Sequence, residues 1–205
     1  MYKKIIKRFL DILLSILIFP FFILLLIILA PIIYLEDKGK VFYNGKRLGK
    51  DGKVFKMYKF RTMKENSEDI RNEDGSTYNG ENDTRVTKVG KFLRKTSLDE
   101  VPQIINVLKG DMSFVGPRPD LPEHMKLYSE FEKRKLEIRP GITGYNQAYY
   151  RNSVEWKERI KNDIYYIDNL TIWLDIKVIF KTIVTVFKKE GVYIKQWVKN
   201  MKLKN

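Results

Sequence analysis

The stretch ILLSILIFPFFILLLIILAPIIYL, residues 12–35, contains no charged side chain and decides how the rest of the chain must be arranged. As one straight helix it would measure about 36 Å, which exceeds the roughly 30 Å hydrocarbon core of a bilayer. The run is too long for the apolar core of a signal peptide, and no small-residue cleavage site follows it. We therefore expect a membrane segment that stays in the protein.

Two features of this run argue against a simple transmembrane span. Pro20 and Pro31 interrupt it, and each removes a helix N–H. Both flanks are cationic, and the positive-inside rule places both on the cytoplasmic face. A helix that bends near Pro20 and returns satisfies both flanks, so the sequence favours a re-entrant helix, although the flanks alone leave a span open. Asp11, at the polar edge, is placed to pair with Lys7 or Arg8.

Composition limits the chemistry of the remaining chain. Of 205 residues, 39 are Lys or Arg and 25 are Asp or Glu, which gives a net charge of +14 and predicts an anionic partner. There is no Cys, which excludes disulfides, thiolate nucleophiles and Cys-based metal sites. His124 is the single histidine, so a His-rich metal centre is excluded as well. Acid–base chemistry therefore falls to carboxylates.

The chain after the membrane segment predicts an α+β fold that is mainly helical. Strands over 41–43 and 54–63 flank a turn-rich GKRLGKDG segment and form a hairpin. The pattern then predicts a long polar loop, a helix, a rigid proline-rich segment and a charged helix, over 64–88, 99–109, 111–122 and 123–138.

An amphipathic helix is expected over about 171–189. Its apolar residues share one face, and three lysines, Lys177, Lys181 and Lys188, lie on the opposite face of the same helix. Core packing and an interfacial membrane helix explain this pattern equally well. The predicted domains are a membrane helix over 1–38, a compact catalytic domain over 39–190 and a basic tail over 191–205.

The stretch TSLDEVPQ, residues 96–103, carries two adjacent carboxylates before a helix. A structural role is available: Asp99 can serve as an N-cap, or Ser97 and Glu100 can form a capping box. A chemical role is favoured by arginines that border prolines, because a preorganised guanidinium binds phosphate with little entropy loss. Arg118 and Arg139 border prolines, Arg94 lies just upstream of the acidic pair, and Arg151 closes the next turn-rich stretch; these four are the phosphate-binding candidates. A carboxylate beside Mg²⁺ and such arginines can attack phosphorus.

The sequence resembles the bacterial sugar transferases, small monotopic polyprenyl-phosphate phosphoglycosyl transferases, from about Lys7 to Tyr193. The matching segments are KR (7–8) with Asp11, KG (38–39), VFY (41–43), KMYKFRTM (56–63), SLDE (97–100), PQ (102–103), NVLKGDMS (106–113), VGPRP (115–119) and RPGITG (139–144). The family's re-entrant helix breaks at a Ser-Pro pair whose proline would fall at Leu24 here. The prolines of this chain lie elsewhere, so the position of the bend is expected to differ.

The resemblance implies transfer of a sugar 1-phosphate from a UDP-sugar to polyprenyl phosphate, with Mg²⁺ and release of UMP. It implies that Asp99 is the nucleophile and metal contact and that Glu100 assists. Lys59 and Arg61 join the phosphate-binding candidates. It also implies a monotopic enzyme of the bacterial cytoplasmic membrane, with both termini and the catalytic domain cytoplasmic.

Two other functions compete with this interpretation. A membrane-tethered nucleic-acid binder accounts for the charge, but no recognition motif accompanies it, so we expect no nucleic-acid partner. A non-catalytic membrane scaffold accounts for the apolar run but gives no role to Asp99 and Glu100. Nothing in the sequence selects a sugar, a glycan pathway or an oligomeric state.

Overall fold

The computed structural model describes residues 2–70, 78, 80, 82–151 and 153–188, so the expected tail over 191–205 lies outside the described residues. The fold is α+β and mainly helical, as predicted. Its helices are α1 (Lys7–Asp37), α2 (Lys88–Thr96), α3 (Ile104–Lys109), α4 (Glu130–Lys133), α5 (Tyr145–Tyr149), α6 (Trp156–Asp168) and α7 (Ile172–Lys188). Short π or 3₁₀ segments are η1 (Tyr2–Ile6), η2 (Lys50–Gly52), η3 (Leu98–Gln103), η4 (Pro122–Leu127) and η5 (Arg134–Glu137).

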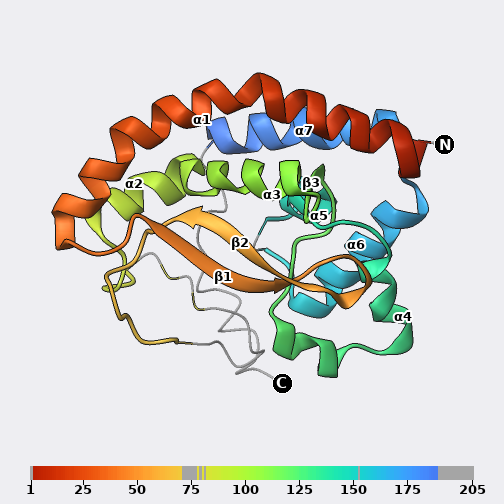
Figure 1. Cartoon of the computed structure of the whole chain (residues 1–205). Helices are drawn as coiled ribbons and strands as arrows, with labels where there is room; N and C mark the ends of the chain where they lie inside the picture. Colours follow the sequence, from red (N-terminus) through yellow and green to blue (C-terminus); the bar gives the residue numbers. More distant parts are fainter. Residues whose placement is uncertain (1, 71–77, 79, 81, 152, 189–205) are drawn as a thin grey trace.

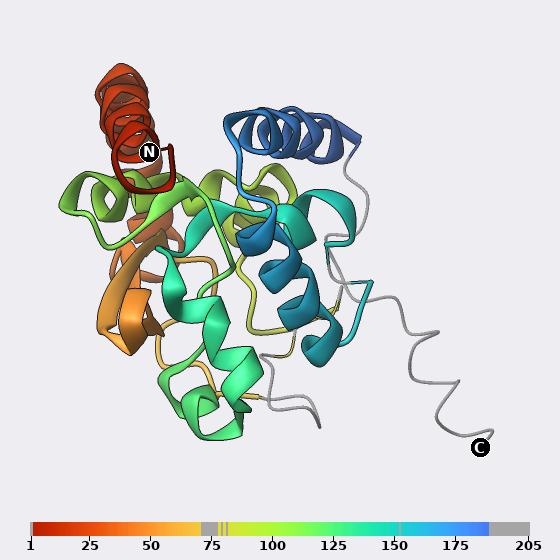
Figure 2. The same ribbon diagram turned by 90° about the vertical axis from the view of Figure 1, so that its right-hand side faces the viewer.

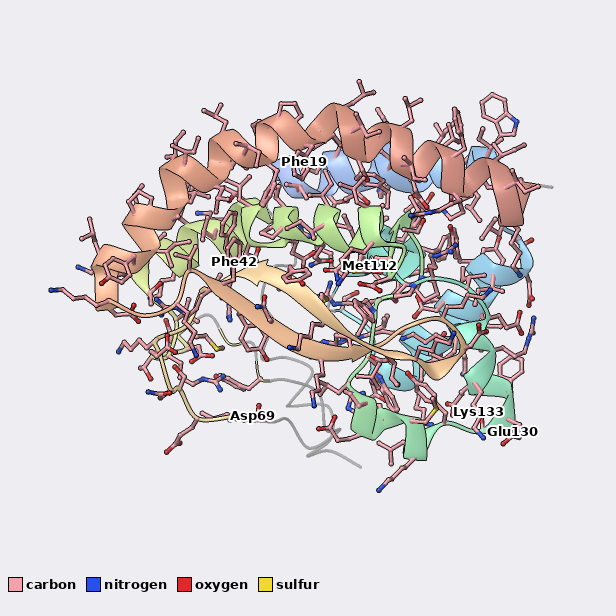
Figure 3. The ribbon with its side chains drawn as sticks, in the orientation of Figure 1. Phe19, Phe42, Asp69, Met112, Glu130 and Lys133 are labelled. Atoms are coloured by element: carbon pink, nitrogen blue, oxygen red, sulfur yellow. The ribbon has the colours of Figure 1, made fainter. Side chains whose placement is uncertain are left out.

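Helix α1 is continuous through both prolines and arches over the rest of the molecule (Figure 1). Phe19 lies near the crown of the arch (Figure 3). Pro20 and Pro31 are exposed on the outer side. A proline removes a hydrogen bond on its own face and lets that face open, so the helix bends away from it. The prolines thus bend the helix towards the protein without ending it.

One face of α1 packs on the protein and the other is bare. The buried residues recur at helical spacing and are Lys7, Asp11, Ser15, Phe22, Leu29 and Ile33. The outer face is apolar and exposed, with Leu17 and Ile27 each 67 % exposed. A soluble protein would not leave so long an apolar stripe in water.

The first turns of α1 are fixed by buried charges. Lys7 Nζ lies 2.5 Å from a carboxylate oxygen of Asp175 in α7. Asp11 accepts hydrogen bonds from the Ser113 hydroxyl and the Phe114 amide, both at 3.0 Å. The expected pairing of Asp11 with Lys7 or Arg8 is therefore wrong. Its carboxylate is satisfied by a strand that folds beneath the helix.

The last turn of α1 is fixed to the same body. Arg61 donates to both carboxylate oxygens of Asp37, each at 2.6 Å. Glu36 accepts from the amides of Lys88 and Val89, at the start of α2. Both ends of the arch are therefore attached to one domain.

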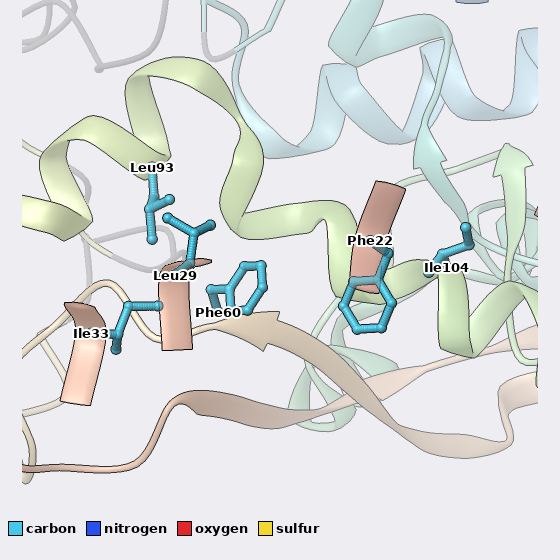
Figure 4. Close-up of a cluster of buried hydrophobic side chains, with 6 residues drawn as sticks. All are labelled: Phe22, Leu29, Ile33, Phe60, Leu93 and Ile104. Atoms are coloured by element: carbon cyan, nitrogen blue, oxygen red, sulfur yellow. The ribbon is translucent and has the colours of Figure 1, made fainter. Parts of the chain in front are cut away.

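The apolar middle of α1 contributes to a buried cluster (Figure 4). Phe22, Leu29 and Ile33 from α1 meet one residue from each of three other elements: Phe60, Leu93 and Ile104. Leu93 of α2 is completely buried and Phe60 is 1 % exposed. This packing joins the helix, the hairpin and the segment that carries Asp99.

The predicted hairpin is present, and its first strand is longer than expected. β1 (Phe42–Leu48) pairs antiparallel with β2 (Val54–Phe60) in a register from Phe42 opposite Phe60 to Leu48 opposite Val54. Part of the expected turn is strand, because Leu48 is buried and extends the pairing. The chain reverses over 49–53, where Asp51 adopts φ +56°.

The helix expected over 99–109 is divided in two. Residues Leu98–Gln103 form the 3₁₀ segment η3, and only Ile104–Lys109 is α-helical. Asp99 is not an N-cap, and Ser97 makes no side-chain cap. Instead Ser97 has φ +58° and turns the chain sharply after α2. The charged helix expected over 123–138 is similarly broken into η4, α4 and η5.

The structure contains a short pair of parallel strands that the sequence did not predict. β3 (Ser113–Val115) pairs with β4 (Gly141–Thr143), and both lie in stretches rich in Pro and Gly. A Cβ on Gly141 would lie 2.1 Å from the Gly116 nitrogen, so the two backbones approach more closely than side chains allow. This contact places the proline turn at Arg118 against the segment that begins α5.

The predicted C-terminal helix is present as α7, with one face packed in the core and another exposed. Val178 is completely buried in a core cluster, whereas Trp173 is 70 % and Phe180 68 % exposed. Figure 2 shows α1 and α7 on the same side of the molecule, with the hairpin, α4 and α6 beneath them. The exposed apolar faces of α1 and α7 therefore share one side of the molecule.

Candidate functional site

Asp99 and Glu100 lie in the first turn of η3, where the chain emerges from the turn at Ser97. Strand β2 packs against η3 and brings Lys59 to both carboxylates. The Lys59 ammonium lies 2.6 Å from a Glu100 oxygen and 3.7 Å from an Asp99 oxygen. Arg118, from the proline turn, lies 3.2 Å from the same Glu100 oxygen. The structure thus brings four predicted site residues together.

These four side chains differ in their access to solvent. The Asp99, Lys59 and Glu100 side chains are 11 %, 16 % and 20 % exposed. The Arg118 side chain is 48 % exposed. Arg118 can therefore reach a ligand that approaches from solvent. Asp99 lies deeper, so a ligand must enter the site to reach its carboxylate.

The two carboxylates have opposite electrostatic environments. Burial raises the pKa of Asp99, and the neighbouring Glu100 charge adds to this, while Lys59 opposes it. Burial would also raise the pKa of Glu100, but Lys59 and Arg118 outweigh that effect and hold it at about 2. The Glu100 carboxylate in turn raises the pKa of Arg118. Asp99 is therefore the more basic carboxylate and the better nucleophile, whereas Glu100 is a weak base paired with two cations.

Arg94 approaches the same site from the last turn of α2. Its Nε donates to the Thr62 hydroxyl at 3.0 Å. Its charge lowers the pKa of Asp99, which indicates that the guanidinium lies near that carboxylate. Arg94 joins Lys59 and Arg118 as a cation around Asp99.

Three other predicted phosphate contacts are placed differently. Arg61 is 8 % exposed and forms an ion pair with Asp37 at the end of α1. Arg139 donates through Nε to the Gly110 carbonyl at 2.8 Å, at the end of α3. Arg151 follows α5 with φ +49°, and its backbone N–H and C=O both bond to Asn146.

Asn106 is a site-building residue that the sequence did not single out for a role. Its side-chain oxygen accepts from the Tyr58 amide at 2.9 Å, and its Nδ2 donates to the Lys56 carbonyl at 2.7 Å. The Asn106 side chain is completely buried, and its amide pairs with backbone groups of β2 as a neighbouring strand would. These bonds fix the position of β2 just before Lys59. Its match to the motif NVLKGDMS was the available signal, but the partner strand was not readable from that motif.

The acidic side chains suit a metal that also binds substrate phosphates. Among the described residues no group of three His, Cys, Asp or Glu could enclose an ion. Mg²⁺ often takes only one or two protein carboxylates and completes its shell with water and phosphate. Asp99 fits this pattern, because among the described residues its carboxylate has Lys59 as its one ion-pair partner. The arrangement places a buried carboxylate, a second carboxylate and several cations close together, and this combination could hold a phosphorylated ligand.

Comparison with known proteins gives matches over nearly the whole chain. A family model described as bacterial sugar transferase matches residues 2–189. The undecaprenyl-phosphate galactose phosphotransferase of Salmonella typhimurium is 41 % identical, over 93 % of this chain and 42 % of the relative. An N-acetylgalactosaminephosphotransferase of Aeromonas hydrophila, named for UDP-N-acetylgalactosamine and undecaprenyl phosphate, is 40 % identical over 91 % of this chain and 44 % of its own length.

Some of these relatives are much longer than this chain. The chain spans less than half the length of the Salmonella and Aeromonas proteins. The uncharacterized sugar transferase EpsL of Bacillus subtilis, 38 % identical, matches over 92 % of this chain and 90 % of its own length. The matched unit therefore occurs both within longer proteins and nearly alone.

Proposed function

Because this chain belongs to the bacterial sugar transferase family, we propose that it transfers a sugar 1-phosphate from a UDP-sugar to undecaprenyl phosphate, releasing UMP. Such a transfer is the first membrane step in building a polysaccharide. The observation that carries the proposal is the Asp99–Glu100 pair, held by Lys59 and Arg118 within a domain that carries an exposed apolar helix. Relatives named for undecaprenyl phosphate support the acceptor.

In the first half-reaction, a carboxylate oxygen of Asp99 attacks the β-phosphorus of the UDP-sugar. The new oxygen–phosphorus bond forms as the bond to the UMP oxygen breaks, and UMP leaves with that electron pair. Lys59, Arg94 and Arg118 surround the carboxylate and stabilise the charge on the phosphate oxygens. Asp99 and the substrate phosphates would hold Mg²⁺, which supplies charge neutralisation when bound.

In the second half-reaction, a phosphate oxygen of the polyprenyl phosphate attacks the same phosphorus. The bond to Asp99 breaks, the carboxylate is regenerated, and polyprenyl diphosphosugar is released. Phosphate is already anionic at neutral pH and needs no strong base. Glu100, whose pKa lies near 2, is then a positioning group that holds Lys59 and Arg118 rather than a proton acceptor.

The membrane helix supports a monotopic arrangement in this proposal. A helix that crossed the bilayer would place its ends on opposite sides, about 30 Å apart. Here both ends of α1 bind the same charged domain: Asp11 binds β3, and Asp37 binds Arg61. Since that domain cannot follow the helix through hydrocarbon, we place α1 as a re-entrant element. Its outer face and the exposed face of α7 would contact lipid.

This arrangement also assigns the parts of the chain. Residues 1–38 form the re-entrant membrane helix, and residues 39–190 form the catalytic domain on the cytoplasmic side of the bacterial inner membrane. Both termini are cytoplasmic. Single cysteines placed at residue 2 and after residue 190, in a chain that has none, should resist a membrane-impermeant thiol reagent added outside intact cells. Labelling of either one from outside would exclude the re-entrant arrangement.

The reaction is tested by UMP release. The full chain in detergent is mixed with Mg²⁺, undecaprenyl phosphate and each of a panel of UDP-sugars. Asp99→Asn should abolish release with every donor, because the amide cannot attack phosphorus. Asp51→Asn makes the same chemical change at an exposed turn and should retain activity. Release by Asp99→Asn at the wild-type rate would remove Asp99 as nucleophile.

A further inference from the structure

Arg8 and Arg139 come from distant parts of the chain and meet at Gly110, which follows α3. Arg8 donates to the carbonyls of Val107 and Leu108, at 2.6 and 3.0 Å. Arg139 donates through Nε to the carbonyl of Gly110. The Arg8 guanidinium also lies against Gly110, within 4 Å of where a Cβ would stand. We call Arg8 and Arg139 the Gly110 arginine pair.

The pair holds more positive charge than its structural contacts require. The two guanidiniums are close enough to repel each other. Asp11, whose charge acts on Arg8, is already bound to Ser113 and Phe114. Arg8 donates to two carbonyls at the end of α3, and Arg139 needs only its Nε to reach the carbonyl of the C-cap residue Gly110, so capping uses only part of the second guanidinium.

Hydrogen-bonding capacity also remains at this pair. A guanidinium has five N–H groups in a planar fork. Within the described part of the chain, Arg139 uses only Nε, and both of its Nη groups are without a partner. Those two groups have the geometry that binds two oxygens of a phosphate.

The pair lies at the base of the apolar surface. Ile5 and Phe9, one helical turn apart on either side of Arg8, are each 65 % exposed. Figure 1 shows the first turns of α1 passing over the end of α3. If this apolar face contacts lipid, the Gly110 arginine pair lies at the depth of the headgroups, where arginine side chains place their charge.

We propose that Arg8 and Arg139 form a binding site for the phosphate group of a membrane lipid, outside the Asp99–Glu100 centre. Arg139 supplies the bidentate fork, and Arg8 supplies a second positive charge. The inference rests on the membrane placement of α1 in the proposed function. A phosphodiester headgroup and an isoprenoid phosphate present the same oxygens, so the site is defined by lipid phosphate and the experiment separates the two sources.

The test measures binding of lipid and phosphate probes to the full chain in non-ionic detergent. Binding is monitored by tryptophan fluorescence or by a shift in unfolding temperature. The probes are dioctanoyl phosphatidylglycerol, dioctanoyl phosphatidylcholine, farnesyl phosphate and inorganic phosphate. Arg139→Gln and Arg8→Gln should each weaken binding of the preferred lipid phosphate by about tenfold or more, the loss of one charge-assisted contact. Arg139→Lys keeps the charge but loses the fork, so it should fall between. Lys126→Gln removes the same charge from exposed η4, on the side opposite α1, and should bind as wild type.

Each outcome decides the proposal. Preference for phosphatidylglycerol supports a headgroup site, and preference for farnesyl phosphate supports a site for the isoprenoid. Equal binding by wild type, Arg8→Gln and Arg139→Gln would overturn the proposal, as would inorganic phosphate binding as tightly as either lipid. Unfolding temperatures without lipid identify variants damaged in folding, and Arg139→Lys then carries the test. Asp99→Asn should bind lipid normally, so failure of the transferase reaction is distinguishable from failure of this site.

Discussion

Replacing Lys59 by Met should move the acid limb of the pH–rate profile to higher pH. The methionine keeps the length of the side chain and removes the charge that lies 3.7 Å from Asp99. At an effective dielectric constant of about 20, that separation corresponds to an attraction of about 4.5 kcal/mol. Since burial already raises the pKa of Asp99, loss of this attraction raises it further. Even a third of the attraction, about 1.5 kcal/mol, displaces the limb by about one pH unit.

The sign follows from the state that reacts. Asp99 attacks only as the carboxylate, so turnover falls as pH drops through its pKa, and a higher pKa moves that loss to higher pH. The same substitution removes one of the two cations that hold Glu100 near 2. Because its pKa is lowered in the folded state, the Glu100 carboxylate stabilises the wild-type fold at pH values above its ordinary pKa, and this contribution is lost as pH falls towards 2. Without Lys59 the contribution is smaller, so the variant should unfold at a higher pH on acidification.

The assay is UMP release as a function of pH at subsaturating donor, which reports kcat/KM. Lys59→Arg keeps the charge and should leave the limb within a few tenths of a pH unit of wild type, whatever its rate. Lys56→Met removes an equivalent charge from an exposed position of the same strand and should leave the whole profile unchanged. A Lys59→Met enzyme that turns over with the wild-type acid limb would refute the argument that Lys59 controls Asp99.

Three further substitutions test how the fold is held. Arg61→Met leaves Asp37 without its buried partner and should lower the free energy of unfolding, measured by denaturant, by about 3–5 kcal/mol. KM for the donor should not change. A raised KM at normal stability would indicate that Arg61 binds substrate. Burial raises the pKa of Asp163 to about 6, despite Lys135 at 3.1 Å, so stability from its neutral form is present at low pH and lost as pH rises from about 4 through 6. Asp163→Asn should therefore gain stability relative to wild type across that window, and a parallel pH dependence of the two proteins would contradict this. Leu93→Ala empties a fully buried position and should cost about 2–5 kcal/mol in the same unfolding measurement; a loss below 1 kcal/mol would show that the cluster around it closes the cavity.

The sequence predicted the long apolar helix and drew attention to the acidic pair because both are visible in local patterns. An uncharged run of this length is typical of a membrane segment, and two adjacent carboxylates stand out within a long family match. Their catalytic roles stay a prediction. The hairpin was found for the same reason, since a turn signal between apolar strands is a short-range feature. Amphipathic periodicity likewise located α7, although not which of its residues would face the core.

Local patterns failed where backbone conformation depended on distant partners. The segment over 99–109 divides into η3 and α3 because Ser97 adopts a left-handed conformation and β2 packs against the turn. The parallel pairing of β3 with β4 joins strands separated by more than 20 residues, each only three residues long. Neither strand has enough periodicity to be recognised alone.

By itself the sequence determined which side chains were available: a chain without cysteine, with one histidine, an apolar run and an acidic pair among many cations. Only the tertiary structure decided which cations serve which anions. Arginine carries the same charge wherever it lies, so sequence could not separate Arg118, beside Glu100, from Arg61, beside Asp37, or Arg139, at Gly110. Coulombic and hydrogen-bonding interactions act over a few ångströms, and the chain's path in three dimensions sets those distances.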